Sequence, residues 1–268
     1  MSEVKNLMVD AGGAKIPCAV FGKGEKCVVI LPGVGDGLTT VEGKAAFLAP
    51  TYKDARKKYK IIMMSRRIPL PDKFTTKDMA GDIKLVMDAL GIEKASIFGV
   101  SMGGMIAQYF AADYPERTEK LVLAVTAAKK TEEMENSGKE WLEYIEKGDG
   151  VGFMKSSVKN MYTEKYYKKN GWLCGLTGRF MMPKSYERYL RMWDACVSHN
   201  AVDSLCKITA PTLIIGGKED RTVGTKASYE LKEKIRGAEL FMYEGFGHAL
   251  YDEAPDFYKK VFDFIGDD

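Results

Sequence analysis

Short apolar runs alternate along the chain with longer segments in which apolar residues recur at helical spacing. A continuous apolar run predicts a strand buried on both faces, as in a parallel sheet. The predicted strands are NLMV, IPCAVF, CVVIL (27–31), IIMM (61–64), SIFGV, LVLAV (121–125), TLIIGG (212–217) and ELFMY (239–243). The predicted helices run over 45–59, from Thr75 or Thr76 to Leu90, after Ser101 with helical spacing from Met105 onward and an end at Pro115, and over 225–236 and 255–265. This alternation predicts an α/β fold with a doubly wound, mostly parallel sheet.

One segment interrupts the alternation. From about Lys129 to Lys207 the pattern is helical and rich in aromatic and methionine residues, and it lies between two predicted strands. Ligands of open α/β sheets bind outside the carboxyl ends of the strands, so an insertion at that edge is placed to cover a pocket. We therefore predict a core of residues 1–128 and 208–268 and a helical cap, or lid, of residues 129–207. The alternative is an ordinary helical subdomain whose aromatic residues form its own core.

Composition narrows the class of protein. Hydrophobic residues make up 46% of the 268 residues and charged residues 29%, as in ordinary globular proteins, and the net charge of +3 predicts no attraction to nucleic acid. No apolar run approaches the roughly 20 residues of a membrane span, and the N-terminal residues lack the apolar core of a signal peptide. The five cysteines are odd in number and widely spaced, which predicts neither a disulfide framework nor a zinc site and favours a cytoplasmic location.

A serine lies where a predicted strand gives way to a predicted helix. Residues 99–103, Gly-Val-Ser-Met-Gly, match the pattern G-x-S-x-G, which in a strand–turn–helix setting forms a nucleophile elbow. The serine must then adopt a positive φ, and side chains two residues before and after it would collide, which explains the two glycines. The pattern alone is weak, and the serine could be a turn residue. Its setting makes Ser101 a candidate nucleophile.

A serine hydroxyl needs a base to take its proton, and the chain has only two histidines. His199 lies within the predicted cap, where a surface or core histidine is the plainer interpretation. His248 follows the last predicted strand in a glycine-flanked loop and is our predicted base. The imidazole needs an anion to orient it, and Asp220 follows the penultimate strand. Its neighbour Glu219 is an alternative, whereas Asp252 is more simply explained as the start of a helix.

Five motifs resemble the α/β-hydrolase superfamily, and the resemblance runs nearly end to end. They are LPGVGDG (31–37), GVSMGG (99–104), YPERTEKLVLAVTAA (114–128), APTLIIGGKED (210–220) and GFGHALY (245–251). The resemblance implies a triad in the order Ser101, Asp220, His248. It also implies an oxyanion hole made by the backbone amides of Met102 and Val34. Many relatives read His-Gly-x where this chain reads Pro32-Gly33-Val34, so a loop-bracing histidine is missing. Gly224 stands where relatives often have proline.

The resemblance implies acyl transfer to the serine with no metal ion and no organic cofactor. The predicted activity is hydrolysis of a small or medium carboxylic ester, similar to the carboxylesterase and enol-lactonase branches, with a small-molecule ester as partner. Carbon–carbon bond hydrolases, acyltransferases, hydroxynitrile lyases and haloperoxidase-like enzymes use nearly the same triad and remain alternatives. A ligand-binding member of the fold without turnover is another. The sequence makes no prediction of the oligomeric state.

The predicted cap is locally basic. Between 155 and 191 there are nine basic residues (155, 159, 165, 168, 169, 179, 184, 188 and 191) against two acidic residues, Glu164 and Glu187. One interpretation is attraction of an anionic acyl or leaving group. The other, which we favour, is a solvated lysine-rich helix face.

Overall fold

The computed structural model describes residues 4–180, 182–183 and 185–267. Its sheet has eight strands in the order β1-β2-β4-β3-β5-β6-β7-β8. The strands are β1 (Val4–Asp10), β2 (Lys15–Phe21), β3 (Cys27–Leu31), β4 (Lys60–Met64), β5 (Ala95–Val100), β6 (Thr118–Ala124), β7 (Thr212–Gly217) and β8 (Glu239–Tyr243). Strand β2 pairs antiparallel with β1 and β4, and the pairs from β4 to β8 are parallel. The predicted mostly parallel α/β sheet is confirmed.

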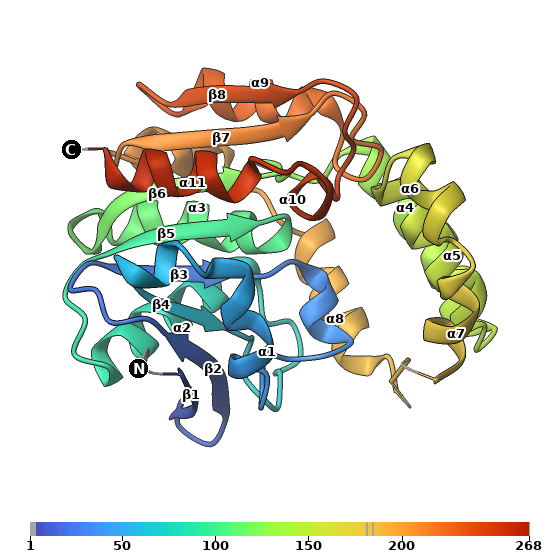
Figure 1. Ribbon diagram of the computed structural model, residues 1–268, viewed down its shortest axis with the longest axis horizontal. Helices are drawn as coiled ribbons and strands as arrows, with labels where there is room; N and C mark the ends of the chain where they lie inside the picture. Colours follow the sequence, from blue (N-terminus) through green and yellow to red (C-terminus); the bar gives the residue numbers. More distant parts are fainter. Residues whose placement is uncertain (1–3, 181, 184, 268) are drawn as a thin grey trace.

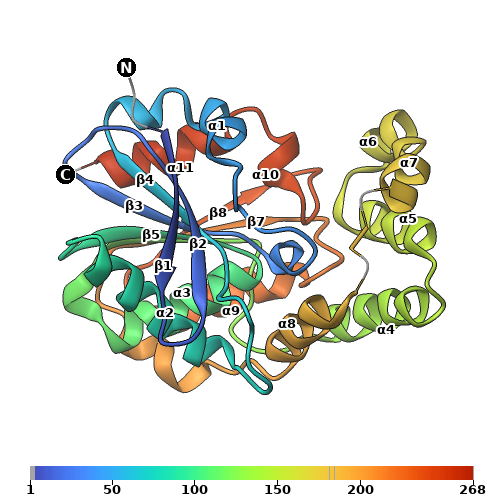
Figure 2. The same cartoon turned by 90° about the horizontal axis from the view of Figure 1, so that it is seen from below.

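Helices cover both faces of this sheet (Figures 1 and 2). On one face lie α2 (Thr76–Ala89), α3 (Met102–Asp113) and α9 (Thr225–Lys234), and on the other lie α1 (Ala45–Leu48), α10 (Leu250–Glu253) and α11 (Phe257–Gly266). Each face has its own buried apolar cluster. The continuous apolar strands β3 and β5 supply side chains to both clusters, which explains why they carry no polar alternation.

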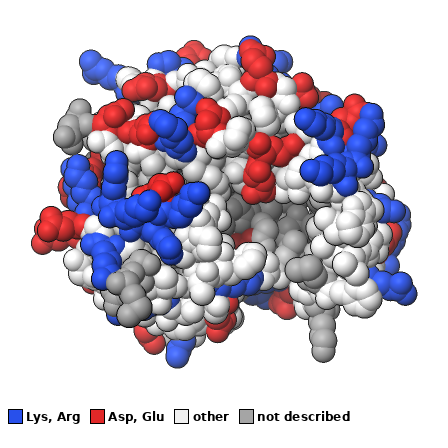
Figure 3. All heavy atoms as spheres, viewed as in Figure 1, with Lys and Arg blue, Asp and Glu red and all other residues white. Residues whose placement is uncertain are grey.

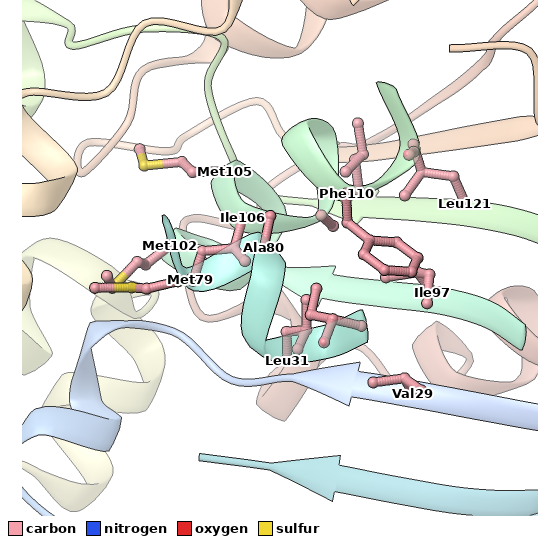
Figure 4. Packing of buried hydrophobic residues seen from close by; sticks show 14 of the residues in the cluster. Val29, Leu31, Met79, Ala80, Ile97, Met102, Met105, Ile106, Phe110 and Leu121 are labelled. Atoms are coloured by element: carbon pink, nitrogen blue, oxygen red, sulfur yellow. The ribbon is translucent and has the colours of Figure 1, made fainter. Parts of the chain in front are cut away.

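Helix α3, which begins directly after Ser101, is fixed between the sheet and α2. Figure 4 shows Ile106 and Phe110 of α3 packed among Met79 of α2 and Ile97 of β5. Helix α2 starts at one of its two predicted N-cap residues, Thr75. The Thr75 Oγ1 atom accepts from the Asp78 amide, and the Asp78 carboxylate accepts from the Thr75 amide. The start of α3 therefore rests on a well-packed layer.

Among the described residues, five α-helices lie between β6 and β7 in the sequence, and we name them after the cap predicted for this segment. These cap helices are α4 (Glu132–Glu146), α5 (Gly150–Met161), α6 (Glu164–Asn170), α7 (Leu173–Phe180) and α8 (Glu187–Val197). They stand beyond the end of the sheet at which β5 runs into α3 (Figure 1). Trp141, Phe153, Tyr189 and Trp193 form a buried cluster of their own, with Trp141 and Trp193 ring centroids 5.4 Å apart. These aromatic residues thus form the hydrophobic core of the helical segment, whereas Trp172 is 72% exposed.

The single helix predicted over 45–59 is wrong. Helix α1 ends at Leu48, and two short 3₁₀ turns follow, Ala49–Tyr52 and Ala55–Lys57. Pro50 lies in the first turn of the first of them. Because proline has no N–H and its ring clashes with the preceding helical turn, an α-helix cannot continue through this position.

Candidate active site

Ser101 has the strained backbone that the elbow pattern predicts. It joins β5 to α3 with φ 54° and ψ −121°. Its amide donates to the Ala124 carbonyl (2.9 Å), and the Thr126 hydroxyl donates to its own carbonyl (2.7 Å). A non-glycine residue at positive φ persists only where its surroundings hold it. The neighbouring strand β6 and the residues after it supply that hold.

The flanking glycines are required by close backbone contacts. A Cβ atom at Gly99 would lie 2.4 Å from the Gly103 carbonyl oxygen, and one at Gly103 would lie 2.0 Å from the Leu31 carbonyl oxygen. These distances are far below van der Waals contact with rigid backbone atoms. The collision expected from the G-x-S-x-G pattern is therefore present on both sides of the serine.

His248 lies between Ser101 and Asp220. Its Nε2 atom is 3.0 Å from Ser101 Oγ, and its Nδ1 atom is 2.9 Å from Asp220 Oδ2. His248 and Asp220 are buried, with 2% and 6% of their surfaces exposed. The three side chains come from the segments after β5, β7 and β8, whose carboxyl ends meet at one edge of the sheet. The structure thus brings together the three residues predicted as nucleophile, acid and base.

The Asp220 carboxylate is held on its other side by the backbone. Its Oδ1 atom accepts from the amides of Thr222 (2.8 Å) and Val223 (3.0 Å), which leaves Oδ2 directed at His248. The two alternative acids lie elsewhere. Glu219 is exposed, and the Asp252 carboxylate accepts from the Tyr162 hydroxyl at 2.7 Å.

The loop after β3 lies against the serine. A Cβ atom at Gly33 would be 3.3 Å from Ser101 Cβ, so the loop passes the nucleophile at close range. Val34 is the first residue of a 3₁₀ turn, Val34–Gly37, and Met102 is the first residue of α3. Amides at first helical positions have no acceptor within their own helix. Both amides predicted for the oxyanion hole are thus free of intrahelical bonds and border Ser101.

A buried charged network braces this loop, and the sequence analysis did not predict it. Arg66 is 2% exposed and donates to the Pro32 carbonyl, while its own amide donates to Asp36 Oδ2 (3.0 Å). The Ser65 hydroxyl donates to the same carboxylate. Arg188 of α8 donates to Asp36 Oδ2 at 2.8 Å. Burial lowers the pKa of Arg66, and the Asp36 charge opposes that shift.

The missing loop histidine therefore has a replacement in this chain. The Arg66 guanidinium holds the carbonyl two residues before Val34, and the Asp36 carboxylate holds the turn two residues after it. One signal in the sequence pointed to this network. Ser-Arg-Arg at 65–67 directly follows the apolar strand β4, so polar groups emerge at the carboxyl edge of the sheet.

His199 lies outside the site. It is 3% exposed, its Nδ1 atom is 2.9 Å from Thr76 Oγ1, and its ring makes an edge contact with Tyr109. Burial lowers the pKa of His199 to about 4. It is thus a neutral core histidine.

The basic residues of the cap helices divide into two groups. Lys155, Lys159, Lys165, Lys168, Lys169 and Arg179 are exposed. Arg188 pairs with Asp36, and Arg191 pairs with Asp72 and Glu187, whereas Lys184 lies outside the described residues. Figure 3 shows basic side chains gathered over α6, and a hollow in the same face between the sheet and α5–α7. The exposed lysines have the form of a solvated helix face.

Two other kinds of site are absent from the described part of the chain. Within the described ranges, no three His, Cys, Asp or Glu side chains are grouped as metal ligands. Among the helices of those ranges, none combines the length and apolar character of a membrane span.

Comparison with known proteins agrees with the fold. Residues 50–255 match the model of the alpha/beta hydrolase fold family. A 2-hydroxy-6-oxononadienedioate/2-hydroxy-6-oxononatrienedioate hydrolase of Klebsiella pneumoniae is 26% identical over 97% of this chain and 94% of its own length. MGS-M2, an alpha/beta hydrolase enzyme from a deep-sea metagenome library of the Medee basin, superposes with a TM-score of 0.86 (24% identity, 98% of both chains). The enol-lactonase of Burkholderia xenovorans superposes with a TM-score of 0.81 (20% identity, 97% and 100% of the two chains). The chain, in which the strained Ser101 lies within hydrogen-bond distance of the buried His248, belongs to the alpha/beta hydrolase family.

Proposed function

We propose that the protein is a serine hydrolase in which Ser101 is the nucleophile, His248 the general base and Asp220 the orienting acid. One observation carries the proposal: His248 is bonded at once to Ser101 Oγ (3.0 Å) and to Asp220 Oδ2 (2.9 Å). A base within hydrogen-bond reach of the nucleophile and oriented by a third group is the arrangement that nucleophilic catalysis requires.

The first step forms an acyl-enzyme. Ser101 Oγ attacks the substrate carbonyl carbon while His248 Nε2 takes the hydroxyl proton. The tetrahedral intermediate then collapses, and the bond to the leaving group breaks as the imidazolium returns the proton to it. Water, deprotonated by the same imidazole, attacks the acyl carbon and releases the carboxylic acid and the free serine. Asp220 remains ionised throughout and stabilises the imidazolium.

The amides of Met102 and Val34 are proposed to bind the oxyanion. Both lie at first helical positions beside Ser101, where their N–H groups have no acceptor within the helix. Losing one oxyanion-hole donor costs about 3 kcal/mol of transition-state stabilisation in a serine protease. Arg66 and Asp36 therefore act on the reaction indirectly, by fixing the loop that carries the Val34 amide.

The proposed substrate is a small or medium carboxylic ester, and residues 129–207 are proposed to act as the cap over it. The nucleophile and the base each have a neutral neighbour in the sequence: Val100 precedes Ser101 and packs against the apolar core, and the buried Ala249 follows His248. An ester alcohol leaves once it accepts the proton from His248, and neither of these neighbours needs to supply a further donor. The hollow between the sheet and α5–α7 gives this substrate room.

Carbon–carbon bond hydrolysis is a second candidate, favoured by the curated relatives. Several hydrolases named for 2-hydroxy-6-oxononadienedioate are 26–27% identical over 91% or more of this chain. The same serine would attack a ketone, and the leaving carbon would take the proton.

Labelling and turnover test the proposal together. A fluorophosphonate probe should label the wild-type protein and not Ser101→Ala, with the circular dichroism of the two proteins unchanged. Labelling that persists in Ser101→Ala would remove this residue from the mechanism. A panel of p-nitrophenyl esters beside a 2-hydroxy-6-oxo-dienoate then separates the two candidates. Turnover of the dienoate with negligible ester hydrolysis would refute the ester proposal.

A further inference from the structure

The turn between α5 and α6 lies directly against the chain segment that carries His248. We call residues 161–163 the cap junction and residues 247–253 the histidine segment. The cap junction closes α5 at Met161 and opens α6, where Thr163 is the N-cap and accepts from the Tyr166 amide (3.1 Å). The histidine segment includes the whole of α10, Leu250–Glu253. A piece of the cap thus contacts the part of the core that holds the proposed base.

A backbone hydrogen bond joins the two immediately beside the histidine. The amide of Ala249, the residue after His248, donates to the Met161 carbonyl at 2.8 Å. A Cβ atom at Gly247, the residue before His248, would lie 2.9 Å from the same carbonyl oxygen. The Met161 carbonyl therefore touches both neighbours of the histidine.

Three side-chain bonds extend this contact along α10. The Tyr162 hydroxyl donates to Asp252 Oδ2 at 2.7 Å. The Thr163 amide and hydroxyl donate to the two oxygens of Glu253, at 2.9 and 2.7 Å. Bonds to carboxylates are the stronger class of hydrogen bond. Asp252 itself is exposed, whereas the bonds of Thr163 to Glu253 are partly buried.

The histidine segment has support on its other side as well. The Glu219 amide donates at 3.0 Å to the carbonyl of Phe246, the residue just before the segment, and so ties its start to the loop of Asp220. His248 is thus placed between the loop that carries the acid and the cap junction. Loss of either support would leave the backbone around His248 held on one side only.

We infer that Tyr162 and Thr163 are positioning residues, which hold the histidine segment so that His248 Nε2 stays in reach of Ser101 Oγ. The inference rests on the proposed function, because it assigns these residues to the base of that mechanism. Neither residue touches the reacting atoms. A displacement of about 1 Å in a catalytic group can cost on the order of 100-fold in rate, so bonds that fix the segment act on turnover.

Two substitutions remove the two hydroxyl bonds with little change of shape and leave the bond from the Thr163 amide to Glu253 in place. Tyr162→Phe deletes one hydroxyl, and Thr163→Val replaces the hydroxyl by a methyl group. We expect the double variant to lose about tenfold in kcat for p-nitrophenyl butyrate, with KM changed by less than about twofold. The rate of fluorophosphonate labelling should fall in parallel. Amide hydrogen exchange over residues 245–253 should become faster, because these bonds no longer help to hold the Met161 carbonyl against the Ala249 amide.

Two further variants serve as rescue and control. Thr163→Ser keeps the hydroxyl and should retain the wild-type kcat. Tyr109→Phe removes a tyrosine hydroxyl that bonds the Asn200 carbonyl at 2.7 Å, away from the histidine segment, and should change neither kcat nor the exchange of residues 245–253. A merely structural role would lower thermal stability and leave kcat unchanged.

The outcomes separate this inference from the proposed function. Wild-type labelling and turnover with unchanged kcat in Tyr162→Phe, Thr163→Val and the double variant would overturn the inference alone. A rise in KM with constant kcat would also overturn it, because the cap junction would then act on substrate binding. A wild-type protein that the probe does not label would overturn the proposed function and this inference with it.

Discussion

Asp220 and His248 face each other across 2.9 Å, and two backbone amides hold the second oxygen of the same carboxylate. The orientation of the Asp220 carboxylate is therefore fixed by the backbone, independently of its bond to the imidazole. Neither Glu219 nor Asp252 has this relationship to the histidine, since Glu219 is exposed and Asp252 binds Tyr162.

This geometry predicts which acidic residue is needed for turnover. Asp220→Asn keeps the shape of the side chain but removes the charge, so it favours the wrong imidazole tautomer. We expect a loss of about 10⁴-fold in kcat, as in the corresponding change of a serine protease. Steady-state kinetics with an activated ester measure it. Glu219→Gln is the matched control and should retain the wild-type rate. The reverse order of effects would assign the acid to Glu219.

A glycine of the elbow and a glycine of α2 should respond in opposite ways when a methyl group is added: the first substitution should lower the stability and the second should raise it. Gly103→Ala places a Cβ atom 2.0 Å from the Leu31 carbonyl oxygen, which forces the backbone to move and costs roughly 3 kcal/mol. Gly81→Ala in α2 meets no atom within 4 Å and should stabilise the helix by about 0.5–1 kcal/mol. Urea unfolding of both variants measures the difference. Equal stability of the two would contradict the contact at Gly103.

The carboxylate of Asp36 predicts a large effect on stability. Its removal in Asp36→Ala takes the ion-pair partner from Arg188 and also removes a negative charge that favours the charged form of the buried Arg66. Breaking a buried ion pair in this way costs roughly 3–5 kcal/mol. Urea unfolding should show the loss, whereas Asp54→Ala, which removes a pair whose side chains are 75% and 72% exposed, should change little. A small effect at Asp36 would mean that water reaches Arg66.

His199 predicts how stability changes in acid. Its pKa lies at about 4 in the folded protein and near 6.5 when unfolded. Between these values the unfolded chain binds a proton that the folded protein does not, so the free energy of unfolding falls as the pH falls from 6.5 to 4. The whole contribution is about 3 kcal/mol and is fully present above pH 6.5. Urea unfolding across this range should show a shallower slope in His199→Asn. An identical slope would refute the assignment.

Much of the fold could be predicted because its signals are local. Continuous apolar runs give β3, β4 and β7 almost to the residue, and Thr75 with Asp78 marks the start of α2. The elbow was predictable because a glycine is required two residues before Ser101 and another two residues after it. The histidine was predictable because the chain has only two of them.

Contacts between distant segments were not predictable in this way. Arg188 and Asp36 are 152 positions apart, and no periodic pattern links an arginine on a cap helix to a turn after β3. The bonds of the cap junction to Asp252 and Glu253 have the same character. The helix expected over 45–59 was wrong because Pro50 was not taken into account as a residue that interrupts an α-helix.

Arg188 and the cap junction attach the inserted helices to the core at two separate places, one at the turn after β3 and the other beside His248. This arrangement sets a rule for chimaeras. A helical insert transplanted from another member of the family into this core must bring an arginine for Asp36 and a hydroxyl-bearing turn for Glu253. An insert that lacks either anchor would leave Asp36 or Glu253 of the recipient without the partner that the insert supplies.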